Sequence, residues 1–258
     1  MMDTAATNPR EARLAMRRGA WTGPTTYKVP GYVQCNLVAL PKAYAYDFLV
    51  YCQRNREACP IVDITDPGDV VPRYAAPDAD LRTDLPRYRV FQNGMLVDEP
   101  TDVTRYWRED AVAFLIGSSL TFDEPLRRIG VELSPEVWVL ETSLPTRPAG
   151  PFAGPLIVTM RYFTPEDAIR AVQLTARFPW NHGPPIHLGS PEAIGANLQA
   201  PLVGPPVTSL PSDKIPVFWA CGVTPQSSAL NAGIEWMITH SPGHGFITDL
   251  QADHFSQP

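Results

Sequence analysis

The sequence predicts a compact α/β protein. Short apolar runs rich in β-branched and aromatic residues have the length of buried strands, and they alternate with amphipathic segments of helical period. The chain holds 29 prolines among 258 residues, so rigid loops must end many of these elements and keep them short. Because we find no internal repeat, low-complexity tract or clear linker, we expect one unit over residues 1–258, with room for a smaller subdomain inserted in the middle.

The first half of the chain opens with a helix and then alternates strands with helices. Asn8 can cap the first helix and Gly19 can close it, and Asn93-Gly94 between two alternating runs is a hairpin signal. The expected helices are Pro9–Arg18 and Lys42–Arg54, and the expected strands are Val33–Leu40, Pro60–Thr65, Tyr88–Phe91 and Met95–Val97.

The second half continues the alternation. We expect a helix that opens at Asp102–Trp107 and runs on through Ala111–Ile116, and another helix capped by Thr164. Residues 190–214 are rich in Pro, Gly and Ser, which is typical of irregular structure. The remaining expected helices are Phe122–Ile129 and Pro165–Phe178, and the remaining expected strands are Val137–Leu140, Leu156–Met160, Val217–Ala220 and Trp236–Ile238.

Composition restricts the classes of function. A formal net charge of -6 argues against a nucleic-acid partner, whose binding surface would be basic. No apolar run approaches the roughly 20 residues that span a bilayer, and the N-terminus lacks the pattern of a secretory signal, so we expect a cytoplasmic protein without a membrane partner. Its four cysteines show no metal-type spacing, and we expect reduced thiols. A homodimer is compatible with the sequence.

The strongest local signal lies near the C-terminus, where two apolar runs each stop at a polar group. In α/β proteins such groups face the crevice in which ligands bind, and histidine suits proton transfer because its pKa lies near neutrality. The candidate catalytic residues are Cys221, His240, His244 and Asp249. The candidate substrate-binding residues are Tyr32, Asn36, Arg82, Arg161, Thr224 and Gln226.

Each candidate also has a structural interpretation. His240 can hydrogen-bond loop carbonyls, Cys221 can be an inert thiol beside Trp219, and Asp249 can cap the end of the chain. The arginines can form surface salt bridges, which is their commoner fate. The spacing from His240 to His244 suits a metal only on a helix, and Ser-Pro-Gly breaks a helix there, so we expect no metal. His182 and His187 lie in Gly/Pro turns and are expected to be structural.

The order of motifs along nearly the whole chain resembles that of the D-glutamate cyclase family, whose bacterial members are called hydro-lyases. The resemblance implies an α/β fold with a large mixed β-sheet flanked by helices and a smaller α+β subdomain. It also implies a dehydration, in which D-glutamate closes to 5-oxo-D-proline. The motifs are Gly23–Thr25, Pro30–Val38, Asp80–Tyr88, Glu99–Asp102, Arg147–Phe152, His182–Gly183, Pro185–His187, Pro216–Gln226 and Ile238–Asp249.

Several motifs depart from the family pattern. Leu140–Ser143 stands where the family has Tyr-Arg-Thr-Asn, and Glu141 in place of that arginine would repel a substrate carboxylate. The stretches Gly117–Ser119 and Gly243–Gly245 replace Gly-Cys-Ser and Gly-His-Met. We therefore expect the fold and reaction type to be kept and the substrate to differ from D-glutamate.

These observations lead to a hydro-lyase hypothesis. The enzyme would be a dehydratase or cyclase acting on a small carboxylate-bearing or amide-forming substrate of specialised metabolism. No P-loop and no Gly-x-Gly-x-x-Gly occurs, so we expect no organic cofactor. The alternatives are a housekeeping D-glutamate cyclase and a non-catalytic protein that binds a small molecule on the same fold.

Overall fold

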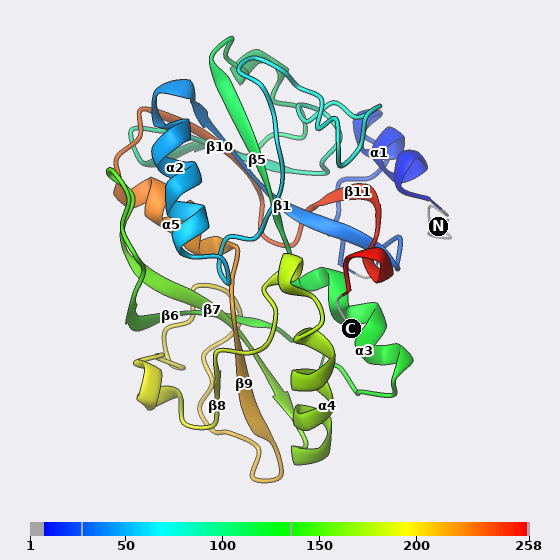
Figure 1. Ribbon diagram of the computed structural model, residues 1–258, viewed down its shortest axis with the longest axis vertical. Coiled ribbons are helices and arrows are strands. Elements are labelled where there is room, and N and C mark those ends of the chain that lie inside the picture. The colour runs from blue at the N-terminus through cyan, green and yellow to red at the C-terminus, as the bar shows by residue number, and fades with distance from the viewer. Residues whose placement is uncertain (1–7, 27, 135, 257–258) are drawn as a thin grey trace.

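The computed structural model describes residues 8–26, 28–134 and 136–256, and it contains two β-sheets with helices packed against them (Figure 1). The larger sheet has the strand order β2-β5-β1-β10-β3-β4, with β11 also paired to β1, and the smaller sheet has the order β6-β7-β9-β8. The α/β class predicted from sequence is confirmed. Every strand pair in the described residues is antiparallel.

The larger sheet is built around β1, which pairs with three other strands. Both faces of β1 are buried: Val38 packs in one apolar cluster with Phe48 of a neighbouring helix, and Leu37 lies in a second cluster on the other face. Burial on both faces explains why β1 reads as a nearly continuous apolar run. The strands of this sheet are β1 (Tyr32–Pro41), β2 (Ile61–Ile64), β3 (Tyr88–Gln92), β4 (Met95–Asp98), β5 (Ala111–Gly117), β10 (Trp236–His240) and β11 (Phe246–Gln251).

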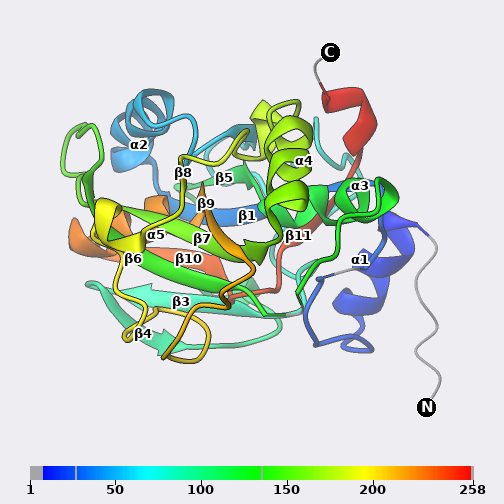
Figure 2. The same cartoon turned by 90° about the horizontal axis from the view of Figure 1, so that it is seen from below.

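The smaller sheet is formed by the chain between β5 and β10. The chain crosses to it after β5 and returns through α5 (Figure 1). The ends of β5, β9 and β10 lie close together because Gly117, Gly222 and His240 each contact Asn36 or Leu37 of β1. Figure 2 shows α2 and α4 on one side of the sheets and the β3–β4 hairpin at the opposite edge. The strands of the smaller sheet are β6 (Trp138–Pro145), β7 (Pro155–Phe163), β8 (His187–Leu188) and β9 (Ile215–Ala220).

The helices have local causes in the sequence. The side chain of Asn8 accepts a hydrogen bond from Glu11 N and caps α1, and Thr164 caps α4 in the same way. The α-helices are α1 (Pro9–Arg17), α2 (Lys42–Arg54), α3 (Asp123–Arg128), α4 (Pro165–Thr175) and α5 (Val223–Asn231). Short 3₁₀ turns are η1 (Thr104–Tyr106), η2 (Ser119–Phe122), η3 (Pro179–Asn181), η4 (Pro191–Ile194) and η5 (Ala252–Phe255). In the described ranges, no helix has both the length and the apolar character needed to cross a membrane.

The prediction of one helix is wrong. Ala111–Ile116 does not continue a helix from Asp102–Trp107 but lies in β5, whose seven residues are all buried. An apolar run buried on both faces shows neither a helical nor an alternating period, so its length has to decide, and seven residues are typical of a strand. The strand β11 was also not predicted, because it follows a glycine-rich turn and only its first three residues are buried.

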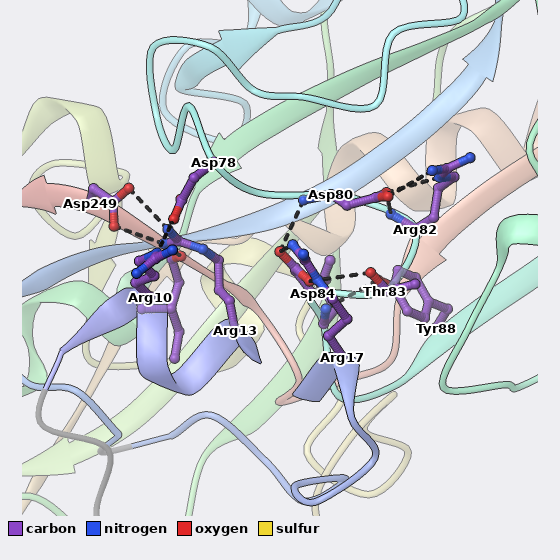
Figure 3. A network of polar contacts seen from close by, with 12 residues as sticks. Arg10, Arg13, Arg17, Asp78, Asp80, Arg82, Thr83, Asp84, Tyr88 and Asp249 are labelled. Carbon is purple, nitrogen blue, oxygen red and sulfur yellow. Dashed lines mark hydrogen bonds and ion pairs between the residues drawn. The ribbon is translucent and has the colours of Figure 1, made fainter. Parts of the chain in front are cut away.

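Helix α1 is fastened to the larger sheet by arginines (Figure 3). The buried Arg13 side chain forms a bidentate pair with Asp249, at 2.8 and 3.0 Å, and also bonds Asp78 at 2.6 Å. One turn later, Arg17 makes a second bidentate pair with the fully buried Asp84, at 2.6 and 2.7 Å. These pairs tie three distant parts of the chain together.

Candidate functional site at the junction of the sheets

Amide and glycine residues meet where β1 faces the start of α5. The buried Asn36 side chain on β1 donates through Nδ2 to Gly117 O, at the end of β5, over 3.3 Å. Gly222, which precedes α5, lies so close to Asn36 that a Cβ at position 222 would collide with the amide. A Cβ on Gly117 would in the same way collide with the Trp180 carbonyl of η3. Both glycines are therefore required for the close approach of these segments.

His240 is held at this junction in a defined tautomer. The ring is buried at the end of β10, and its Nδ1 lies 3.2 Å from Leu37 N and 3.1 Å from Gln226 Nε2. A backbone N–H can only donate, so Nδ1 is the acceptor and the neutral ring carries its proton on Nε2. Burial lowers the pKa of His240 to about 4, so the ring is neutral near pH 7. His240 can therefore donate one hydrogen bond from Nε2.

His244 has the opposite tautomer. Its Nδ1 lies 2.8 Å from Pro242 O within the turn that follows β10. A carbonyl oxygen can only accept, so Nδ1 carries the proton and Nε2 of the neutral ring presents a lone pair. The ring is partly exposed. The two histidines on one turn thus offer a donor and an acceptor.

Cys221 lies between β9 and α5, beside Gly222. Its backbone N–H donates to Ile157 O at 3.0 Å, which fixes the chain at this point. Burial raises the pKa of the Cys221 thiol, and hydrogen bonds from Thr159 and Val223 N only partly oppose that shift. The thiol is therefore neutral at physiological pH, which does not favour the thiolate nucleophile considered from the sequence.

Five other candidates lie outside this junction or are committed to structural bonds. Thr224 Oγ1 accepts from Ile157 N at 3.0 Å and donates to Ile157 O at 3.2 Å, so it joins α5 to β7. Asp249 pairs with Arg13 of α1 and orients no histidine. We therefore assign Thr224 and Asp249 structural roles and leave them out of the proposed site.

The two candidate arginines are already paired. Arg161 Nη2 lies 2.7 Å from Asp123 Oδ1, and both side chains are almost completely buried. Arg82 Nη2 lies 2.7 Å from Asp80 Oδ2 in a bidentate pair. Because each guanidinium already balances the charge of a neighbouring carboxylate, neither is assigned to the substrate.

Tyr32 lies at the other end of β1, where it pairs with Gln251 and lines a small hollow. Of the sequence candidates, the structure brings Asn36, Gln226 and His240 to the junction, with Cys221 next to Gly222. His244 follows in the turn after β10, close enough to His240 to help lower the pKa of that ring. Within the described ranges, no group of three or more His, Cys, Asp or Glu side chains could hold a metal ion.

Sequence reasoning undervalued two residues. His182 is buried with φ 82°, its Nδ1 donates to Glu57 O at 2.8 Å, and burial lowers its pKa to about 4. Its neighbour Asn181 donates to Ser118 O and to Thr121 Oγ1, at 3.3 and 3.0 Å, and so joins η3 to the end of β5. In the sequence, the pair His182-Gly183 after Pro179 was the available sign that these residues hold an unusual turn. The structure shows this turn in the positive φ of His182, which is uncommon for a residue other than glycine.

The fold is that of an α/β protein with two antiparallel sheets, and the junction between the sheets is the candidate site. The family model described as D-glutamate cyclase matches residues 112–249, and the chain belongs to the D-glutamate cyclase family. A relative from Bacillus licheniformis that bears the name "Putative hydro-lyase" is 49% identical over 253 residues, covering 96% of both chains.

Further relatives carry the same name. One from Rubrobacter xylanophilus is 52% identical over 245 residues, covering 93% of this chain and 94% of its own. One from Azorhizobium caulinodans is 51% identical over 250 residues, covering 94% and 91%. A solved nitrogen repressor-like protein from Methanococcus jannaschii covers 98% of both chains with a TM-score of 0.43 and 13% identity, a likeness from which nothing is concluded.

Proposed function

We propose that this protein is an enzyme of the hydro-lyase type, which removes water from a small carboxylate-bearing or amide-forming substrate. Membership of a cyclase family and relatives named as hydro-lyases support the reaction class. The observation that carries the proposal is the pair of opposite tautomers at His240 and His244. Loss of water requires a group that takes a proton and a group that stabilises the departing oxygen.

The opposite tautomers support a different role for each histidine in this proposal. His244 Nε2 has the lone pair, so it takes the proton from the attacking nitrogen or the carbon next to the carboxylate, and the resulting imidazolium returns that proton to the leaving hydroxyl. His240 Nε2–H stays in place and donates a hydrogen bond to the oxygen on which negative charge develops. A neutral imidazole suits this task because its lowered pKa keeps it from acting as a competing acid or base. In a cyclisation the C–N bond forms, the C–O bond breaks, and water leaves.

We favour a substrate from a specialised metabolic pathway over D-glutamate. Glu141, where the family pattern has arginine, is exposed on β6, and a carboxylate there disfavours binding of an anionic group nearby. The family match nevertheless makes D-glutamate the first compound to test. A protein that binds a small molecule without turning it over is the remaining alternative.

Turnover by the purified protein tests the proposal. Incubation with D-glutamate, and with small hydroxy acids and amides, should yield a dehydrated or cyclised product that NMR detects. His244→Ala should lower kcat by roughly 100- to 10,000-fold, and His240→Ala by roughly 100- to 1,000-fold, the usual costs of losing a proton-transfer group or an oxyanion donor.

His187→Ala provides the matched control. This histidine lies on β8 with its Nε2 bonded to Ser190 O, and its loss should leave kcat within about twofold. Full activity in His240→Ala and His244→Ala together would contradict the proposal. Stoichiometric binding of a metabolite without any turnover would favour the binding protein.

A further inference from the structure

A hollow lies between the C-terminal end of α2 and the loop that joins β6 to β7. The loop runs beside α2 in both views of the molecule (Figures 1 and 2). The volume of the hollow is about 640 Å³, within the roughly 300–1,000 Å³ of small-molecule sites. Its lining residues are 53–58, 145–147, Leu156 and Ile186, and none of them belongs to the junction of the sheets.

The charge of this hollow is opposite to that of the whole chain. Three arginines and one glutamate, Glu57, line it, although the formal net charge of the protein is -6. Most arginines of the chain form ion pairs with aspartate or glutamate side chains. Among the described residues, the three that line the hollow have no such partner. They are Arg54, Arg56 and Arg147.

The backbone of Arg147 is held firmly against α2. The buried Asn55 side chain accepts from Arg147 N at 2.8 Å through Oδ1 and donates to Arg147 O at 2.9 Å through Nδ2. The same Nδ2 donates to Tyr51 O at 2.9 Å, so one amide joins the last turn of α2 to the loop. Pro148 follows and fixes its own φ. The guanidinium of Arg147, by contrast, has no hydrogen-bond or ion-pair partner in the described chain.

Two further contacts hold the loop beside α2. Arg54 Nη1 donates to Pro148 O. Gly150 lies so close to α2 that a Cβ at this position would collide with the Asp47 side chain. The end of α2 and the loop therefore form two walls whose separation is fixed by the fold, and an arginine without a carboxylate partner stands on each.

The chemistry of these walls suits a doubly charged ligand. A guanidinium presents a planar set of N–H donors that matches a carboxylate or a phosphate. Since Arg54 already donates to a carbonyl, Arg56 and Arg147 are the two groups that can hold an anion. An anion between them would also relieve their mutual repulsion. We propose that this hollow binds a small dianion, with a dicarboxylate or a phosphate group held by Arg56 and Arg147.

Calorimetric titration of the full chain at low ionic strength and about pH 8 tests this site. The probes are glutarate and inorganic phosphate, with butyrate as the analogue that has a single carboxylate. We expect at least one dianion to bind tenfold or more tightly than butyrate. Its affinity should fall when the ionic strength is raised to about 0.15 M, because salt screens the attraction between exposed charges.

The two dianions distinguish the possible sources of the ligand. Tighter binding of glutarate would assign the hollow to a dicarboxylate metabolite, and tighter binding of phosphate would assign it to a phosphate-bearing one. No binding of either dianion, or equal affinity for all three probes, would overturn the proposal. Binding is measured without turnover, so the result does not depend on the hydro-lyase proposal.

Three arginine variants form a matched set. Arg56→Gln and Arg147→Gln should each weaken binding of the preferred dianion about tenfold, the usual cost of one charge-assisted hydrogen bond. Arg18→Gln is the control, because Arg18 is exposed at the end of α1, has no ion-pair partner in the described residues and does not line the hollow.

The control changes the net charge by the same amount, and it should alter binding less than twofold. Urea unfolding of each variant shows whether a loss of binding reflects a loss of fold. Equal weakening in Arg18→Gln and Arg147→Gln would mean that the dianion senses only the overall charge, and would overturn the site. Unchanged affinity in both Arg56→Gln and Arg147→Gln would do the same.

Discussion

At the scale of single residues, the orientation of three hydrogen bonds decides what the site can do. Leu37 N–H and the Gln226 amide both meet His240 Nδ1, while His244 Nδ1 meets a carbonyl. The two neutral rings therefore differ in which nitrogen carries the proton, although their side chains are chemically identical. Gln226, expected from sequence to bind substrate, is better described as the residue that positions His240.

Substitution of Gln226 should change the tautomer of His240. In Gln226→Glu the carboxylate accepts only, so it favours a proton on Nδ1 and raises the pKa of His240. We expect kcat to fall about tenfold with KM little changed, and the ¹⁵N shifts of His240 to move toward the Nδ1-protonated or charged form.

Gln226→Leu is the control for this change. It removes one donor but leaves Leu37 N–H on Nδ1, so the ¹⁵N shifts should keep the Nε2-protonated pattern. Identical spectra for wild type and Gln226→Glu would show that the side chain at position 226 does not act on the His240 ring.

At the scale of elements, ion pairs hold α1 against the larger sheet. Arg13 is the centre of this contact because one buried guanidinium joins Asp78 and Asp249, which are 171 residues apart in the sequence. The aspartates are about two-fifths exposed, so water can partly replace the lost partner in a variant.

Arg13→Met should destabilise the protein by about 2–3 kcal/mol, below the ~3–5 kcal/mol of a fully buried broken pair. Arg10→Gln is the comparison, because Arg10 also bonds Asp78 but is 70% exposed, and its loss should cost less than ~1 kcal/mol. Urea unfolding curves of both variants measure the difference, and equal midpoints would contradict it.

The elements also show how far the sequence predicts the structure. The helix Lys42–Arg54 and the hairpin around Asn93-Gly94 were predicted correctly, because helical period and turn chemistry are local properties. The strand β5 was missed because its pairing with β1 and β2 is not local, and uniform burial erases the period. The prediction therefore failed at the strand that completes the centre of the larger sheet.

The candidate site was predicted in part for a similar reason. His240 and His244 stood out because polar residues end an apolar run, which can be read along the chain. The ion pairs of Arg161 and Asp249 join residues 38 and 236 positions apart, and no local pattern shows that these side chains are already occupied. The orientation of the Gln226 amide toward His240 likewise depends on the assembled sheets.

At the scale of the whole molecule, two buried neutral histidines make folding sensitive to pH. Burial lowers the pKa of both His182 and His240 to about 4, from the roughly 6.5 of an exposed histidine. Between these values the unfolded chain binds more protons than the folded one. Their contribution to stability is therefore complete above pH 6.5 and is lost as the pH falls toward 4.

The free energy of unfolding should fall between pH 7 and pH 4.5 by about 2–3 kcal/mol for each of the two histidines. Urea unfolding at several pH values measures this slope. His182→Gln and His240→Gln should each make the slope shallower, with His187→Gln, at a half-buried position on β8, as the comparison. A slope unchanged by either of the first two substitutions would show that these rings do not titrate as expected.

The bond from Leu37 to His240 has one more consequence. In an antiparallel ladder the partner of a strand N–H is ordinarily a main-chain carbonyl, and here an imidazole nitrogen takes that position. The His240 ring thus takes part in the hydrogen bonding of the sheet, and its position is fixed by the register of β1 against β10. Slow deuterium uptake at the Leu37 amide would report directly on the position of the His240 ring, even in the absence of any ligand.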